Sequence, residues 1–220
     1  MRKPAAHFHL PGLFEFYEFY RAFLPLYRAH RAYFYDWCEI ASIYGAPEGC
    51  IWGGGRVGSG TAGAQEVLAL MQDFGISARL TFSNCLLRPE HLIDRPCNAL
   101  CRAFSDSAGP QNGVIVHSEL LLTYLKKHYP RLYFVSSTTK VLTRFSQLRQ
   151  ELEREDFSYV VPDFRLNRAF AQLDALPQAL KDKVEFLCNE CCWFGCKDRK
   201  VCYETVSRKN LGEAVEHRCT

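Results

Sequence analysis

The sequence has little net charge and no long apolar run. Its 27 Lys and Arg residues against 24 Asp and Glu residues leave a net charge of +3. The basic residues are scattered, which argues against nucleic acid as a partner. No apolar run approaches the roughly 20 residues that a membrane-spanning helix needs. The first residues also lack the continuous apolar segment of a signal peptide. We therefore expect a cytoplasmic protein with no membrane partner.

The cysteine count does not fit a disulfide framework. Eleven cysteines in 220 residues is an odd number in a chain much larger than small disulfide-stapled domains. Free or metal-bound thiols are the better interpretation. Apolar residues make up 48% of the chain and aromatic residues 14%, which is typical of a globular domain with one buried core.

Short apolar or β-branched runs alternate with longer helical patterns along the chain, which indicates βα units and a parallel sheet. Strands are predicted at His7–Leu10, Glu39–Tyr44, Ser77–Phe82, Gly113–Val116, Leu132–Ser136, Tyr159–Pro162 and Val184–Cys188. Helices are predicted at Leu13–His30, Thr61–Phe74, Arg88–Phe104, Glu119–His128, Thr143–Arg154 and Asn167–Leu180.

Seven parallel strands fit either a (β/α)8-type (TIM-type) barrel or an open doubly wound sheet. We favour the barrel because polar residues follow nearly every predicted strand, and a barrel brings all strand ends to one face. These residues are Tyr44, Ser83, Asn84, His117, Ser118, Ser137, Thr138, Thr139, Asp163, Asn189 and Glu190. Helix capping is the alternative for each of them.

The expected organisation is a βα-barrel domain over residues 1–203, with a cysteine-rich C-terminal segment, followed by a polar tail over 204–220. No eighth strand is evident, and about 250 residues is more typical of this barrel. The barrel is therefore expected to be incomplete, or closed by a partner subunit or a second copy.

The densest chemical signal is the cysteine segment. Five of the eleven cysteines lie in it, at Cys188, Cys191, Cys192, Cys196 and Cys202. Thiolates at such spacings bind zinc or a [4Fe–4S] cluster. A distant ligand is expected from Cys219, or from Cys38. The adjacent Cys191 and Cys192 do not suit one ion, so one is spare, and Cys188 is alternatively a buried strand-end residue. The expected ligand set is Cys188, Cys192, Cys196, Cys202 and Cys219; the alternative is that none binds metal.

The pattern Asn189-Glu-x-Cys192-x3-Cys196-x2-Arg199 resembles the cysteine region of the peptidase U32 group. The resemblance implies a TIM-barrel-like domain and a [4Fe–4S] cluster on its C-terminal face, with Cys192 and Cys196 as the matching pair. Members implicated in ubiquinone and RNA hydroxylation imply a redox or hydroxylation-type enzyme. No Ser/His/Asp or H-E-x-x-H signature supports a peptidase. The alternative is a non-enzymatic accessory or binding protein with a structural zinc site.

A glycine-rich stretch contains a literal G-x-G-x-x-G at Gly53, Gly55 and Gly58. It does not follow a strand directly and lacks the acidic residue of a dinucleotide site at the required distance. Two interpretations are left. The loop is mobile over the barrel mouth and uses Arg56 to bind an anionic substrate, or it is a connection that needs glycine's conformational freedom.

Three residues at strand ends are the catalytic candidates. His117 suits a general base, because the pKa of histidine lies near neutrality. Asp163 and Glu190 are expected to form an acid/base pair across the mouth. Asn84 and Asn189 join Arg56 as substrate-binding candidates. A structural histidine and a helix-capping aspartate are the alternatives, and the substrate is left open between a small molecule and a macromolecule.

Overall fold

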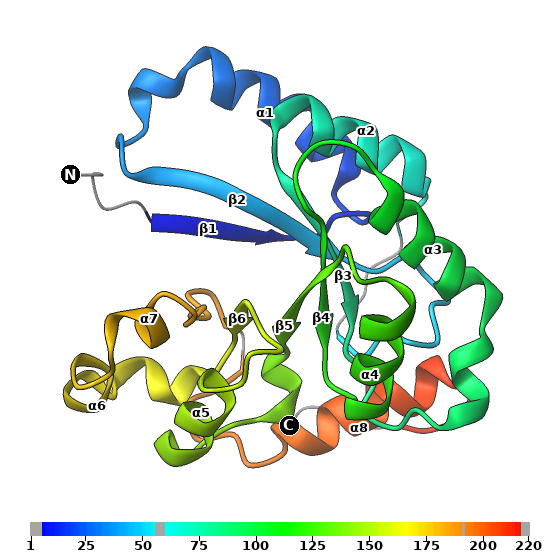
Figure 1. Ribbon diagram of the computed structural model, residues 1–220, viewed down its shortest axis with the longest axis vertical. Helices are drawn as coiled ribbons and strands as arrows, with labels where there is room; N and C mark the ends of the chain where they lie inside the picture. The colour runs from blue at the N-terminus through cyan, green and yellow to red at the C-terminus, as the bar shows by residue number, and fades with distance from the viewer. Residues whose placement is uncertain (1–5, 56–59, 191, 217–220) are drawn as a thin grey trace.

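A single parallel sheet forms the centre of the protein (Figure 1). The computed structural model describes residues 6–55, 60–190 and 192–216. Its six strands lie side by side in chain order, β1-β2-β3-β4-β5-β6, and every neighbouring pair is parallel. They are β1 (Ala6–Pro11), β2 (Cys38–Gly45), β3 (Ser77–Phe82), β4 (Gly113–Val116), β5 (Tyr133–Ser136) and β6 (Tyr159–Val160).

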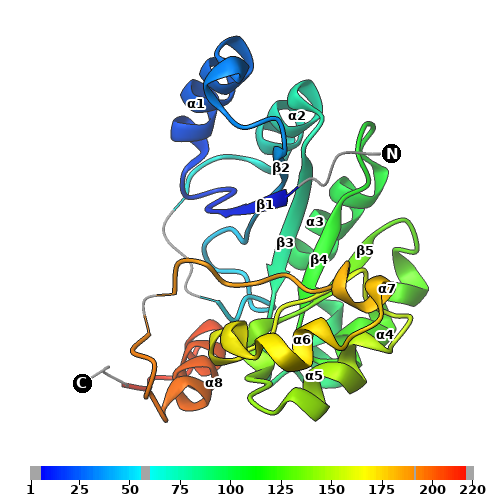
Figure 2. The same ribbon diagram turned by 90° about the vertical axis from the view of Figure 1, so that its left-hand side faces the viewer.

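A helix follows each of the first five strands and packs on the outer face of the curled sheet (Figures 1 and 2). These are α1 (Tyr17–Ala29), α2 (Ala64–Phe74), α3 (Arg95–Asp106), α4 (Glu119–His128) and α5 (Phe145–Leu152). Short helices α6 (Phe170–Asp174) and α7 (Gln178–Lys181) follow β6, and α8 (Arg199–Asn210) comes last. None of the helices in these described ranges has the length and apolar character needed to span a bilayer.

Strand β3 shows how the sequence assigns the two faces of the sheet. Alternate side chains of a strand point to opposite faces. Ala78, Leu80 and Phe82 are fully buried in the main core between sheet and helices. Arg79 and Thr81 point to the concave face, where a smaller apolar cluster lies around Val135. The polar side chains of this strand therefore lie on the concave face of the sheet.

The predicted (β/α)8-type barrel is wrong. The described strands form one open six-stranded sheet that curls into half of a barrel. The fold is therefore an α/β fold with parallel strands in sequential order. The expected seventh strand, Val184–Cys188, is reduced to an isolated parallel bridge between Val160 and Val184. Because β6 has only two residues, it offers too short an edge for further strand pairing.

The polar stretch at the C-terminal end of the described chain includes part of helix α8. The helix crosses the expected boundary between residues 203 and 204, and the division into domain and tail stays a prediction. Its buried side chains are Arg199, Tyr203 and Ser207, which are spaced four residues apart along one face. Ser207 receives the backbone N–H of Cys85 at 3.1 Å, so α8 is attached to the loop after β3.

The described part of the glycine-rich stretch packs closely against the sheet. A Cβ at Gly54 would overlap the backbone carbonyl of Ser83, so this glycine permits a close backbone approach. Trp52 is fully buried beside it and donates its indole N–H to the His91 carbonyl at 2.8 Å. Arg56 and Gly58 lie outside the described residues, so the predicted loop over the mouth is described only up to Gly55.

Candidate functional site

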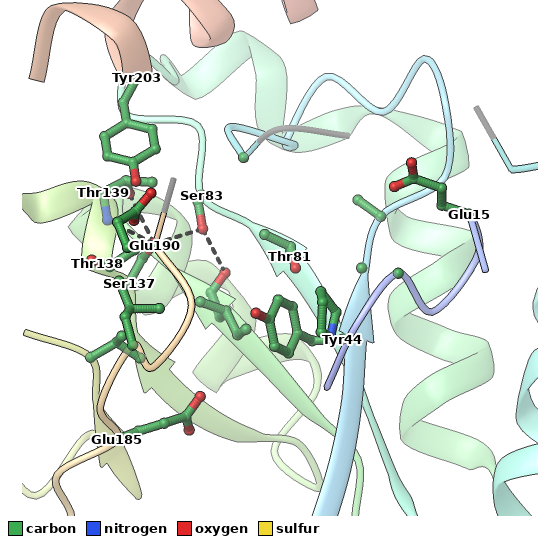
Figure 3. A pocket seen from close by; sticks show the side chains of 18 of the residues that line it. Glu15, Tyr44, Thr81, Ser83, Ser137, Thr138, Thr139, Glu185, Glu190 and Tyr203 are labelled. Atoms are coloured by element: carbon green, nitrogen blue, oxygen red, sulfur yellow. Dashed lines mark hydrogen bonds between the residues drawn. The ribbon is translucent and has the colours of Figure 1, made fainter. Parts of the chain in front are cut away.

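A cavity of about 320 Å³ opens at the carboxyl-terminal ends of the strands (Figure 3). This is the face where barrel enzymes bind substrates, because loops after every strand converge there. The volume is in the range of small-molecule sites. Its polar lining consists of Glu15, Tyr44, Thr81, Ser83, Ser137, Thr138, Thr139, Glu185, Asn189, Glu190 and Tyr203. Glu15 lies across the cavity from Glu190 and Tyr203.

Three hydroxyl groups connect the cavity wall to a histidine. His117 Nδ1 lies 2.8 Å from Thr139 Oγ1. Thr139 donates to Ser137 Oγ at 2.9 Å, and Ser137 Oγ lies 2.9 Å from Ser83 Oγ. Ser83 in turn donates to the Ile115 carbonyl at 3.4 Å. The chain of hydrogen bonds thus joins the loops after β3, β4 and β5.

Counting protons gives this chain a direction. Each hydroxyl has a single proton to donate. Because Thr139 gives its proton to Ser137, it can only accept from His117, which places the imidazole proton on Nδ1 and leaves Nε2 with its lone pair. Burial, together with the ammonium groups of Lys140 and Lys200, lowers the pKa of His117 to about 4. His117 is therefore neutral at pH 7 and able to accept a proton.

The two predicted catalytic carboxylates, Asp163 and Glu190, meet on one arginine. Arg199 has an exposed fraction of 1%, and its guanidinium lies 2.6 Å from Glu190 Oε2 and 3.3 Å from Asp163 Oδ2. Asp163 also binds Arg165 at 2.6 Å and receives the Arg165 backbone N–H. Asp163 therefore does what the capping alternative describes, in addition to its ion pairs. Glu190 receives the backbone N–H of Cys192 at 3.1 Å.

A second buried ion pair lies on the floor of the cavity, on the concave face of the sheet. Arg79 Nη1 lies 2.6 Å from Glu185 Oε2, and Arg79 Nε donates to the Tyr133 hydroxyl at 2.7 Å. Burial raises the pKa of Glu185, with Arg79 opposing the shift. His9 of β1 approaches the same carboxylate at 3.6 Å, but burial lowers its pKa to about 3, so it is neutral at pH 7. Glu185 thus joins the segment after α7 to strands β1 and β3.

The structure places the other substrate-binding candidates differently from one another. Asn189 lines the cavity. Asn84 is fully buried outside it and donates to the carbonyls of Ile51 and Ser207 at 2.7 and 3.1 Å, which fixes the glycine-rich segment and α8. His117 reaches the cavity only through Thr139. The substrate-binding role of these residues stays a prediction.

The described cysteines of the predicted metal site are spread along the segment. Cys188 is exposed, whereas Cys192, Cys196 and Cys202 are half-buried. Among residues 6–55, 60–190 and 192–216, no group of three or more His, Cys, Asp or Glu side chains is placed to hold a metal. Cys191 and Cys219 lie outside the described residues. The described residues alone therefore do not complete a zinc or [4Fe–4S] site.

Sequence reasoning missed the buried charges around the cavity. Arg79 and Glu185 were read as ordinary members of apolar runs, although a charged residue in such a run is itself a signal of a buried partner. Arg199 appeared only as the last residue of the cysteine pattern. Glu190 and Arg199 both belong to this pattern, and they form an ion pair. The spacing between these two residues therefore allows the cysteine segment to be fixed to helix α8.

Comparison with known proteins places the fold near one family. No protein-family model matches the chain, and no curated protein sequence matches it. The solved structure of the U32 peptidase Mk0906 superimposes with a TM-score of 0.62 and 14% sequence identity, over 98% of this chain and 82% of that one. At this identity the likeness concerns the fold. The protein thus has a distant U32-like α/β fold in the form of a six-stranded half-barrel.

Proposed function

We propose that this protein is an enzyme of the peptidase U32-like type, whose substrate occupies the half-barrel cavity and exchanges a proton with His117 through the hydroxyl chain. The observation that carries this proposal is the chain of hydrogen bonds between Ser83 and His117. It begins in the cavity wall at Ser83 and Ser137 and ends at Nδ1 of an imidazole that is neutral at pH 7. Helix capping alone does not require these hydroxyl groups to form a continuous chain of hydrogen bonds to a histidine.

A peptide is the substrate class to test first. The solved structure of similar fold is named as a peptidase, and a cavity of about 320 Å³ accommodates a short peptide segment. In hydrolysis, the attacking water would give up a proton through the hydroxyl chain to Nδ1 of His117. This transfer uses the tautomer with its proton on Nε2, with the hydroxyls of Ser137 and Thr139 turned so that each donates toward the imidazole. Burial raises the pKa of Tyr44 to about 12, so its phenol stays protonated and supplies a hydrogen-bond donor in the cavity (Figure 3).

Replacing His117 with glutamine is expected to lower kcat by about 10²–10⁴-fold, the usual contribution of a general base. Glutamine keeps a donor for Thr139 but cannot take up the proton. The measurement is cleavage of a defined peptide mixture, followed by mass spectrometry. The wild-type kcat/KM should fall as the pH drops through about 4, and this acid limb should vanish in the variant. A wild-type protein that cleaves no peptide, or equal rates for both proteins, would overturn the proposal.

A metal centre in the cysteine segment is the second proposal, with a [4Fe–4S] cluster first and zinc as the alternative. It is favoured by the positive charge beside the matching pair of cysteines. The thiols of Cys196 and Cys192 lie close enough to Arg165 to help raise its pKa, and Arg165 donates to the Cys196 carbonyl at 3.2 Å. A guanidinium in this position stabilises thiolates and an anionic cluster. The described residues alone do not complete its ligand set.

Anaerobic purification with metal analysis and a visible spectrum tests this centre. A cluster predicts a brown protein with broad visible absorption, which Cys192→Ser or Cys196→Ser should abolish. Cys101→Ser is the matched control, since Cys101 is buried in α3, outside the cysteine segment. A colourless protein with stoichiometric zinc would replace the cluster with the structural alternative. A colourless protein without metal would contradict both the cluster and the zinc site.

A further inference from the structure

Two buried cysteines outside the cysteine segment lie against each other. Cys50, in the loop after β2, and Cys97, in the first turn of α3, have their Sγ atoms 3.1 Å apart. The exposed fractions are 7% and 0%. A disulfide needs a separation of about 2.0 Å, which small side-chain rotations can supply from this starting distance. The two cysteines are 47 positions apart in the sequence, so local spacing gives no sign of this contact.

We propose that Cys50 and Cys97 are a reversible dithiol–disulfide pair, oxidised by a small two-electron oxidant of the peroxide class. The inference is independent of the proposed enzymatic function. It rests on the contact between the two sulfur atoms, on their burial and on the difference between their surroundings.

The surroundings assign different roles to the two thiols. The hydrogen bond between the two side chains lowers the pKa of Cys50, and the backbone N–H groups of Trp52 and Gly53 lower it further. The same contact and burial raise the pKa of Cys97. Because Cys50 is also the more exposed of the two, it is the thiolate that meets the oxidant, and Cys97 is the resolving thiol.

The reaction balances with peroxide as the only co-reactant. The Cys50 thiolate attacks one peroxide oxygen, the O–O bond breaks, and water leaves after protonation, giving a sulfenic acid. The Cys97 sulfur then attacks the Cys50 sulfur, the S–O bond breaks and a second water leaves. Two electrons pass from the two thiols to the peroxide. An external dithiol returns both cysteines to their reduced state by exchange.

The bond would fix one wall of the cavity. Cys50 begins a turn in which the Gly53 N–H bonds to the Cys50 carbonyl at 3.0 Å, and Gly55, two residues further on, lines the cavity. Cys97 is held at the start of α3, where its backbone N–H bonds to Asp94 at 2.8 Å. The disulfide would therefore tie the glycine-rich segment to a rigid helix and restrict the unfolded chain over a long loop.

The test uses the unmodified protein. It is treated with hydrogen peroxide, alkylated under denaturing conditions without reductant, digested and analysed by mass spectrometry. We expect a linked peptide containing Cys50 and Cys97, which an external dithiol removes, and a higher Tm for the oxidised protein. Cys101→Ser is the control, since Cys101 is equally buried one helical turn after Cys97; it should form the same link.

Two results would overturn the inference. One is that Cys50 and Cys97 are both alkylated after peroxide treatment, to the same extent as in untreated protein. The other is that linked peptides involve other cysteines and never this pair. A Cys97→Ser variant that folds and still shows the same rise in Tm on oxidation would also contradict it.

Discussion

Replacing Glu185 with alanine is expected to lower the free energy of unfolding by about 3–5 kcal/mol. The substitution leaves the guanidinium of Arg79, which has a side-chain exposure of 1%, without the carboxylate that lies 2.6 Å away. Its remaining partners are the Tyr133 hydroxyl and the ring of Tyr159, with the guanidinium carbon 4.8 Å from the ring centroid. Neither neutralises a buried positive charge, so the cost of its desolvation is no longer offset.

A double substitution separates this effect from simple loss of packing. Replacing both members, Arg79→Met with Glu185→Leu, removes the charges together and is expected to cost far less than the single change. Urea denaturation of the three proteins provides the comparison. If the single and double variants lose equal stability, or the single variant loses less than about 1 kcal/mol, the ion pair does not hold the segment after α7 onto the concave face of the sheet.

Arg199→Ala is expected to have the second largest effect, a loss of about 3 kcal/mol together with release of the cysteine segment. Arg199 binds both Glu190 and Asp163, and its guanidinium packs 5.0 Å from the ring centroid of Phe164. Asp163 keeps Arg165 as a partner in the variant, which is why the loss is smaller than for Glu185.

Limited proteolysis measures the release directly. Cleavage between residues 186 and 198 should become faster in Arg199→Ala, because Glu190 is no longer fixed to α8. Arg208→Ala is the matched control, since Arg208 is exposed near the end of the same helix. Equal cleavage rates in the wild type and both variants would show that another contact fixes the segment.

Most of the sheet was predictable because parallel strands have a simple sequence signature. A parallel strand that is buried on both faces reads as a short apolar run, as Gly113–Val116 does. The structure confirms β1 to β6 within one or two residues of the predicted bounds. The run at Val184 has the same composition but forms only one bridge. Composition does not reveal whether a neighbouring strand is long enough to pair with.

Helix α8 was missed for a different reason. Its buried face consists of Arg199, Tyr203 and Ser207, so the apolar period that identifies an amphipathic helix is absent. These side chains are buried because they bind other polar groups: Arg199 pairs with two carboxylates, and Ser207 lies against the loop after β3. A helix that docks through polar contacts looks like a solvated tail in the sequence.

The candidate site was only partly accessible to sequence reasoning. Strand ends pointed to His117, Asp163 and Glu190, and the structure brings Asp163 and Glu190 onto one guanidinium. The hydroxyl chain depends on contacts between distant residues, such as Ser83 with Ser137, and these are fixed only once the register of β3, β4 and β5 is known. Local spacing contains no information about such a path.

The central claim is that protons move between the cavity and His117 through Thr139, and the kcat of two variants at this position tests it most directly. Thr139→Val keeps the shape of the side chain but breaks the chain, whereas Thr139→Ser keeps the hydroxyl. We predict a loss of about 10²-fold or more for valine and near wild-type kcat for serine. Thr123→Val, on the exposed face of α4, is the control and should not change kcat. Equal kcat for the valine and serine variants, in proteins of equal Tm, would contradict the proposed proton path.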